Sequence, residues 1–241
     1  VNSKYQNDGA KYFKDIPIEF IALPNPGYEF IGWEGISDSS RISMSFSNNS
    51  DLTALFQLSS DIILPDTLYE DVNLTNQSYV VSNDLVINDG VTLTISESTF
   101  IKMPPEGNII VNGILLINGT DYNPVTIINN NPLTIDYRWG AICFNNTSDT
   151  SKINNLHLSG ASRGVDPTYQ YGAISGKDAN LIIKNTLIED VLFPIYMDGG
   201  SVDLKNSEIH CVFTCDFINV KNGIANIDGN SFFGSNAIDT D

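Results

Sequence analysis

Four side chains suited to acid–base chemistry lie in one short segment: Arg163, Tyr169, Tyr171 and Lys177. Cleavage of a polysaccharide by side chains needs a positioned general base, or two to three carboxylates close together. The segment supplies basic groups, but the chain has no D-D motif. These four residues are therefore candidates only for an alternative, catalytic interpretation, and the sequence favours a non-enzymatic one.

Aspartates recur where the chain is expected to turn, and carboxylate oxygens are ligands that Ca²⁺ accepts. Asp216, Asp239 and Asp241 are the candidates for such a site, and a solvated acidic surface is the other interpretation. His157 and His210 lack a third ligand at a spacing typical of metal sites. We expect no cofactor apart from this candidate calcium.

The three cysteines are too few for a disulfide framework. Cys211 and Cys215 are four residues apart, a spacing that can close a small loop, so a disulfide and two free thiols both remain open. Cys143 lies between two apolar residues and is predicted to be a buried apolar side chain.

The composition excludes two classes of partner. The 241 residues include 29 acidic and 12 basic side chains, which gives a formal net charge of −17. Nucleic acids and anionic membranes both demand a basic surface, so neither is an expected partner. No apolar run approaches the ~20 residues that span a bilayer. With 41% hydrophobic residues the chain can bury a core. The strongly acidic charge suits a soluble surface protein, so we expect an extracellular or cell-surface location.

The elements that must position these residues are short strands. Val86–Ile127 holds six apolar, β-branched runs, each closed by a turn signal such as Asn112-Gly113. The first three runs repeat as the last three at offsets of about 22 to 24 residues, which predicts a solenoid with three strands per coil and parallel sheets. The mapping pairs Leu85 with Ile109, Leu93 with Leu115, Ile95 with Ile117 and Ile101 with Val125.

Later coils share the pattern apolar-x-Asn-x-x-apolar. Asn155, Asn185 and Asn206 occupy its central position, with Gly229 in the matching place. An asparagine tolerates the left-handed conformation, and its amide can bond to the same residue one coil further on. The pattern predicts an internal asparagine ladder, and a purely local turn role is the alternative. Trp139 begins a strand and is expected to be structural.

Residues 1–58 do not share this period and are predicted to form a small β module, with a lead-in over 59–75. Expected strands include Val1–Tyr5, Ile16–Leu23 and Tyr28–Trp33. Trp33 and Phe56 are the expected anchors of a core too small to lose either of them.

Two family resemblances follow from these motifs. V-x-x-G-V-T-L-T-I at Val86–Ile95, I-x-V-x-G-x-L-x-I-x-G-T at Ile109–Thr120, P-V-T-I at Pro124–Ile127 and W-G-A-I at Trp139–Ile142 resemble the secreted, pectate-lyase-like right-handed parallel β-helix family. That fold carries lyases, hydrolases, adhesins and spacers alike. The first module resembles the internalin-type B-repeat of bacterial surface proteins, through Ala22, Pro24, Gly27, Tyr28, Phe30, Gly32, Trp33, Gly35, Ala54 and Phe56.

Together these features predict an all-β chain: a small module, residues 1–58, followed by a right-handed parallel β-helix, residues 59–241. The leading function is a non-enzymatic stalk, adhesion or carbohydrate-binding segment of a larger secreted or cell-surface bacterial protein. The expected partners are a glycan or cell-surface ligand and further domains of the same polypeptide, because the helix is expected to continue past residue 241. The alternative is a lyase or hydrolase of an acidic glycan, acting near the 164–178 excursion.

Overall fold

The computed structural model describes residues 13–22, 28–48, 51–130, 138–166, 168–212 and 215–234. The chain divides into two units, Val1–Asp61 and Ile62–Asp241. Within the described ranges every regular element is a strand, and no helix there is long and apolar enough to cross a membrane.

The first unit contains two antiparallel strand pairs. β1 (Ile18–Ile21) pairs with β3 (Arg41–Met44), and β2 (Tyr28–Trp33) pairs with β4 (Ala54–Leu58). Trp33 is 2% exposed, and its ring meets the rings of Phe20 and Phe30 edge-on at centroid distances of 6.4 and 5.7 Å. The predicted core role of Trp33 is confirmed. Phe56 is 38% exposed, so the prediction that it is a second buried anchor is wrong. Val1–Tyr5, Pro24 and Gly27 lie outside the described residues.

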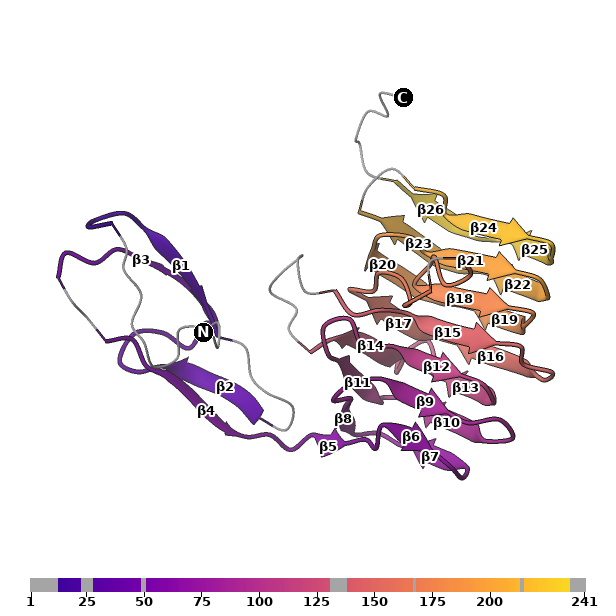
Figure 1. Ribbon diagram of the computed structural model, residues 1–241, viewed down its shortest axis with the longest axis horizontal. Helices are drawn as coiled ribbons and strands as arrows, with labels where there is room; N and C mark the ends of the chain where they lie inside the picture. Colours follow the sequence, from indigo (N-terminus) through magenta and orange to yellow (C-terminus); the bar gives the residue numbers. More distant parts are fainter. Residues whose placement is uncertain are drawn as a thin grey trace. The chain divides into compact units, whose positions relative to one another are not determined.

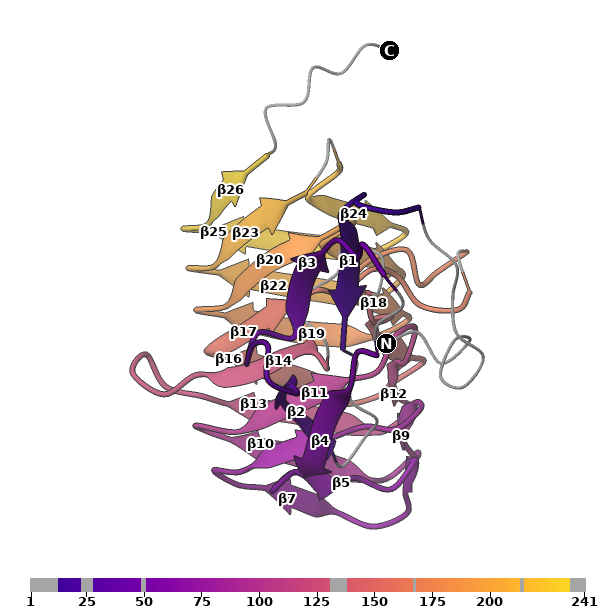
Figure 2. The same ribbon diagram turned by 90° about the vertical axis from the view of Figure 1, so that its left-hand side faces the viewer.

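The second unit is a right-handed parallel β-helix with three strands per coil (Figures 1 and 2). We name its sheets A, B and C in the order in which each coil visits them. Sheet A consists of β6 (Thr67–Leu68), β9 (Leu85–Ile87), β12 (Ile109–Val111), β15 (Ile142–Asn145), β18 (Ile174–Lys177), β21 (Ile195–Asp198) and β24 (Ile218–Lys221). Sheet B consists of β7 (Val72–Leu74), β10 (Thr92–Ser96), β13 (Ile114–Asn118), β16 (Thr150–Asn154), β19 (Asn180–Lys184), β22 (Ser201–Lys205) and β25 (Ile224–Asp228).

Sheet C consists of β5 (Ile62–Ile63), β8 (Ser78–Val80), β11 (Phe100–Met103), β14 (Val125–Asn129), β17 (Leu156–Ser159), β20 (Leu187–Val191), β23 (Glu208–Cys211) and β26 (Ser231–Phe233). In the figures the strands of each sheet stack from the purple first coil to the yellow last one.

The register of the coils confirms three of the four predicted pairings. Leu85 pairs with Ile109 in sheet A. In sheet B, Leu93 pairs with Leu115 and Ile95 with Ile117. Ile101 pairs with Ile127 instead of Val125. The connection before β14 covers residues 119–124, whereas the one before β11 covers only 97–99. The offset between paired residues therefore grows from 22 in sheet B to 26 in sheet C, two more than the predicted 24.

The interior is an aliphatic stack. In β10 and β13 half-buried and fully buried residues alternate, and Leu93, Ile95, Leu115 and Ile117 are the fully buried ones. Burying each such side chain stabilises the fold by about 1.5–3 kcal/mol. Because successive coils repeat the arrangement, the interior is continuous along the helix axis.

The corner between sheets B and C adopts the predicted left-handed conformation. The φ angles of Asn155, Asn185 and Asn206 are 50°, 49° and 49°, and that of Gly229 is 67°. The backbone N–H groups of the three asparagines donate to carbonyls of the next coil, as from Asn185 to Lys205 at 3.0 Å. The conformational part of the corner prediction is therefore confirmed.

Asparagine side chains do form hydrogen bonds along this corner, but they do not form an internal stack: Asn155 is 8% exposed, whereas Asn185 and Asn206 are exposed. Asn185 Nδ2 donates to Asn154 Oδ1 at 3.2 Å, outside the core, and Asn155 Nδ2 donates to the Gly119 carbonyl at 3.1 Å. Side chains along a strand normally alternate between inward and outward. The left-handed backbone of the asparagine interrupts this alternation, so the exposed asparagines face outward although the residue before each of them does so too.

The buried corner position is one residue further along the chain. Thr186 and Ser207 are 1% and 3% exposed. Ser207 Oγ accepts the Thr186 N–H at 3.2 Å, and the Ser207 N–H donates to Asn230 Oδ1 at 2.8 Å. The internal polar stack thus consists of Thr186, Ser207 and Asn230.

The last described coil has a more exposed surface than those before it, with Ile224 64%, Ile227 47% and Phe232 39% exposed. Residues 235–241, on which the prediction of a continuing solenoid depended, lie outside the described residues.

Candidate functional site

The long connection between β17 and β18 covers the outer face of sheet A. We call residues 160–173, of which residue 167 is not described, the excursion. Ser175 lies in register with Cys143 on that outer face, and its Oγ donates to the Gly172 carbonyl at 2.6 Å. A Cβ added at Gly164 would lie 2.6 Å from Cys143 Sγ, so the excursion approaches the sheet closely there. Cys143 is therefore buried, as predicted, and its burial, followed by the charge of Asp84, raises its pKa to about 12.

Side-chain hydrogen bonds hold the excursion in one conformation. Gln170 is 8% exposed; its Oε1 accepts the Asp166 N–H at 2.9 Å and its carbonyl accepts the Gly164 N–H at 2.8 Å. The Tyr196 hydroxyl of β21 donates to the Thr168 carbonyl at 3.0 Å. The excursion is thus attached to sheet A at several points, which is how it positions the side chains that it carries.

The structure brings the four predicted residues together as two cation–π pairs. The Arg163 guanidinium lies 5.3 Å from the ring centroid of Tyr171, and Lys177 Nζ lies 4.6 Å from that of Tyr169. Phe193, which sequence reasoning missed, has its ring centroid 4.4 Å from that of Tyr171.

Two further residues that sequence reasoning missed complete the group. The centroids of Tyr196 and Tyr171 are 6.4 Å apart, and Lys221 Nζ lies 5.1 Å from the Tyr196 centroid. We call Tyr169, Tyr171, Phe193 and Tyr196 the aromatic cluster. The register of sheet A, which places Lys177, Asp198 and Lys221 in one row, is the signal that would have added Lys221.

Hydrogen bonds and neighbouring charges shift three pKa values in this group. Hydrogen bonds from Thr168, backbone first, lower the pKa of Asp166, with Tyr169 and Lys177 adding to the effect. The hydrogen bond to Asp166 and its charge raise the pKa of Tyr169, and the hydrogen bond to Tyr196 raises the pKa of Lys221. A general base works best with a pKa near the working pH. Tyr169 and Lys221 are shifted away from it, so they hold their protons more firmly.

A pocket of about 650 Å³ adjoins the aromatic cluster. Arg163 belongs to both, because its guanidinium lies over Tyr171 and its side chain also lines the pocket. Glu106, Arg138, Trp139, Ser162 and Val165 are among the other lining residues. The pocket is therefore formed where the start of the excursion passes the corner between sheets C and A.

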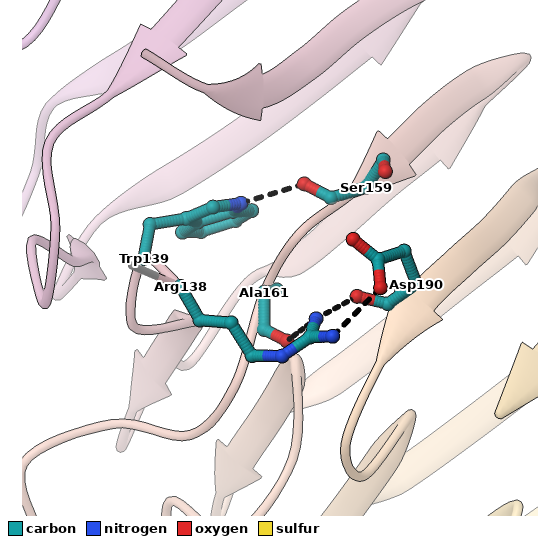
Figure 3. A network of polar contacts seen from close by, with 5 residues as sticks. All are labelled: Arg138, Trp139, Ser159, Ala161 and Asp190. Atoms are coloured by element: carbon teal, nitrogen blue, oxygen red, sulfur yellow. Dashed lines mark hydrogen bonds and ion pairs between the residues drawn. The ribbon is translucent and has the colours of Figure 1, made fainter. Parts of the chain in front are cut away.

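Arg138 and Trp139 are two of the residues that line this pocket, and Figure 3 shows their polar contacts. Arg138 donates through Nη2 to Asp190 Oδ1 at 2.6 Å and through Nη1 to the Asp190 carbonyl. A register shift in β20 and a φ of 50° at Asp190 place this residue beside the guanidinium. Trp139 is fully buried, as its structural role predicts, and its Nε1 donates to the Ser159 carbonyl at 2.8 Å.

The predicted calcium ligands are only partly described. Asp216 Oδ2 accepts from Asn219 Nδ2 at 3.4 Å, and Asp239 and Asp241 lie outside the described residues. Across the described ranges no three His, Cys, Asp or Glu side chains gather as a metal site would require. The two histidines contact glutamates, His157 with Glu189 at 2.7 Å and His210 with Glu208 at 2.6 Å. Calcium binding stays a prediction.

The two close cysteines are bonded to each other. Cys211 and Cys215 form a disulfide with a Cα–Cα distance of 6.6 Å, at the corner between β23 and β24. Of the two alternatives that the sequence left open, the structure contains the disulfide.

Comparisons of the chain with protein-family models, with curated proteins and with solved structures found no match. The function therefore has to be argued from the aromatic cluster, the pocket beside it and the fold that holds them.

Proposed function

We propose that this chain is a non-enzymatic, carbohydrate-binding segment of a larger secreted or cell-surface bacterial protein. The observation that carries the proposal is the aromatic cluster on the hydrogen-bonded excursion, with basic side chains against its rings and a pocket beside it. The β-helix serves as the scaffold that presents this face.

The chemistry of the cluster suits a sugar. A pyranose ring has C–H groups on its faces and hydroxyls around its edge, so it needs an apolar platform with hydrogen-bonding groups next to it. Half-buried Tyr169, Tyr171 and Phe193 supply the platform, and tyrosine combines a flat apolar surface with a polar hydroxyl. Arg163 and Lys177 supply donors at the same place.

The scaffold supports a role at a surface or as a stalk. Seven coils at the usual ~4.8 Å spacing between strands give a rod of roughly 35 Å. Its hydrogen-bonded sheets and the Cys211–Cys215 disulfide resist local opening, which suits an element that holds other parts of a polypeptide apart and carries a binding face on its side.

The alternative function is cleavage of an acidic glycan by the same face. It is less well supported, because the pKa of Tyr169 is raised by Asp166.

The test is a panel of neutral and acidic polysaccharides in affinity electrophoresis. We expect at least one polysaccharide to retard the protein, and we expect Tyr169→Ala to weaken the retardation. The matched control is Tyr122→Ala, because Tyr122 is 95% exposed and lies in the 119–124 connection, outside the excursion.

Two results would contradict the proposal: no retardation by any polysaccharide, or equal losses in the two tyrosine variants. The same samples are assayed for new reducing ends and unsaturated products. Turnover that Arg163→Ala abolishes would establish the catalytic alternative instead.

A further inference from the structure

We propose that the outer face of sheet B is a dimer interface, which packs against the same face of a second copy of this chain with the two helix axes antiparallel. The inference does not depend on the proposed carbohydrate-binding function, whose residues belong to sheet A and the excursion. It follows from the open surface of sheet B, from the distribution of charge along it and from its area.

The described parts of the chain leave the outer face of sheet B uncovered. Its strands stack from β7 to β25 along one side of the β-helix (Figure 1). The outward side chains of β10, β13, β16, β19 and β22 are all half-buried or exposed. Near the middle of the face are three half-buried aliphatic side chains, Ile114 and Leu116 of β13 and Ile182 of β19. The face therefore has an apolar centre that packing would remove from water.

One end of this face is basic. Lys152, Lys184 and Lys205, which we call the lysine strip, lie on three adjacent strands, and Lys184 is directly beside Lys205 in the register. Like charges side by side on a sheet are unfavourable. Lys205 pairs with Asp203 at 3.1 Å, whereas Lys152 and Lys184 are exposed and have no ion pair with any described residue. Because the net charge of −17 opposes self-association elsewhere on the surface, the lysine strip is a place where a second copy is attracted.

The other end of the face is acidic. Glu97 directly follows β10, Asp121 lies in the connection that follows β13, and both are exposed. Thr120 Oγ1 donates to Glu97 Oε2 at 3.0 Å, which holds this carboxylate beside sheet B. Neither carboxylate forms an ion pair within the described ranges. Three strand spacings, about 14 Å, separate Glu97 from Lys184, so these opposite charges cannot pair within one copy.

A twofold axis parallel to the strands, between β13 and β16, brings the two ends together. β13 then faces β16 of the second copy, and β10 faces β19. Ser96 and Lys184 belong to one row across sheet B, so Glu97, next to Ser96, lies opposite the partner's Lys184. The symmetry forms this contact twice. With parallel helix axes each strand would instead face its own counterpart, which places Lys152 against the partner's Lys152.

The size of the face sets the strength of the dimer. Six strands at about 4.8 Å and five residues at about 3.3 Å measure about 29 by 16 Å. Covering this area on both copies removes roughly 900–1,000 Å² from water, which is close to the lower limit for a specific interface. We therefore expect a weak dimer that dissociates as salt screens its charges.

The experiment measures the dissociation constant of the full chain by sedimentation velocity, at low and at high salt. Each single charge reversal, Lys184→Glu or Glu97→Lys, turns two attractions into repulsions and should weaken the dimer about tenfold or more. The double variant restores opposite charges and should dimerise like the wild type. Lys14→Glu is the matched control, because Lys14 is exposed in the first unit and its reversal should leave the dimer intact.

Three results would overturn the proposal. The first is a wild-type chain that stays monomeric at low salt and millimolar concentration. The second is a dimer that survives Lys184→Glu, or whose single variants are not rescued by the double one. The third is a monomeric chain that binds polyphosphate through Lys184, which would assign the lysine strip to an anionic polymer. Circular dichroism spectra equal to that of the wild type ensure that the variants are compared as folded proteins.

Discussion

Ser207→Ala should destabilise the β-helix more than Asn185→Gly does. Asn185 precedes Thr186, which is the equivalent of Ser207 one coil earlier. Ser207 is 3% exposed; its Oγ accepts the Thr186 N–H at 3.2 Å and donates to the Lys205 carbonyl at 3.0 Å. Ser207→Ala leaves a buried backbone donor and a carbonyl without this partner. An unsatisfied buried group costs about 1–3 kcal/mol, so we expect the free energy of unfolding to fall by that amount.

The comparison is Asn185→Gly. Asn185 is exposed, and its φ of 49° suits glycine. Relief of the left-handed conformation, worth about 1 kcal/mol for a side chain with a Cβ, offsets the greater entropy of an unfolded glycine and the loss of a surface hydrogen bond. The free energy of unfolding should change by less than about 0.5 kcal/mol. Urea titrations followed by circular dichroism measure both variants, with the slope m unchanged. Losses of equal size, or a greater loss at Asn185, would refute the assignment of the inward and outward corner positions.

Three further predictions concern the excursion and its surroundings. Gly164→Ala brings a Cβ within 2.6 Å of Cys143 Sγ and should lift the excursion away from sheet A. Cys143 should then react with a thiol reagent without denaturant. The wild-type thiol, which is buried and has its pKa raised to about 12, should not react. The pKa of Asp166 is lowered from 3.8, so its contribution to stability is present above pH 3.8 and is lost as the pH falls through the lowered value. The midpoint of the pH-dependent shifts of the excursion's amide NMR signals should therefore lie below pH 3.8, and a midpoint at or above 3.8 would contradict this. Asp190→Asn removes the charge that faces the buried guanidinium of Arg138 and should lower the midpoint of urea unfolding by an amount equivalent to about 1–3 kcal/mol; an unchanged midpoint would show that the ion pair contributes nothing.

The strand order could be predicted from the sequence because the solenoid repeats locally. Leu85 and Ile109 were paired correctly because short apolar runs and turn signals recur at nearly constant spacing there. Ile101 was paired with the wrong partner because the length of a connection is not encoded in the strands that it joins. The orientation of Asn185 was missed for a related reason. A left-handed residue changes which side chains face inward, and the alternation of apolar and polar residues in the sequence does not show where that change occurs.

The candidate site was only partly predictable. The unusual spacing between coils identified the excursion, and with it Arg163 and Lys177. Nothing in the sequence indicates that the excursion folds back over sheet A, so the contact between Tyr171 and Phe193 could not be predicted. The ion pair between Arg138 and Asp190 joins residues 52 positions apart, and it depends on a bulge in β20 that no motif marks.

The most direct test of carbohydrate binding by this face is chemical-shift mapping by NMR with an oligosaccharide that retards the protein. Our account predicts that the perturbed backbone amides are those of residues 162–173 and 193–196, with Lys221 beside them, and that amides of β19 in sheet B do not move. Perturbations confined to sheet B or to the first unit, with the excursion unaffected, would contradict it.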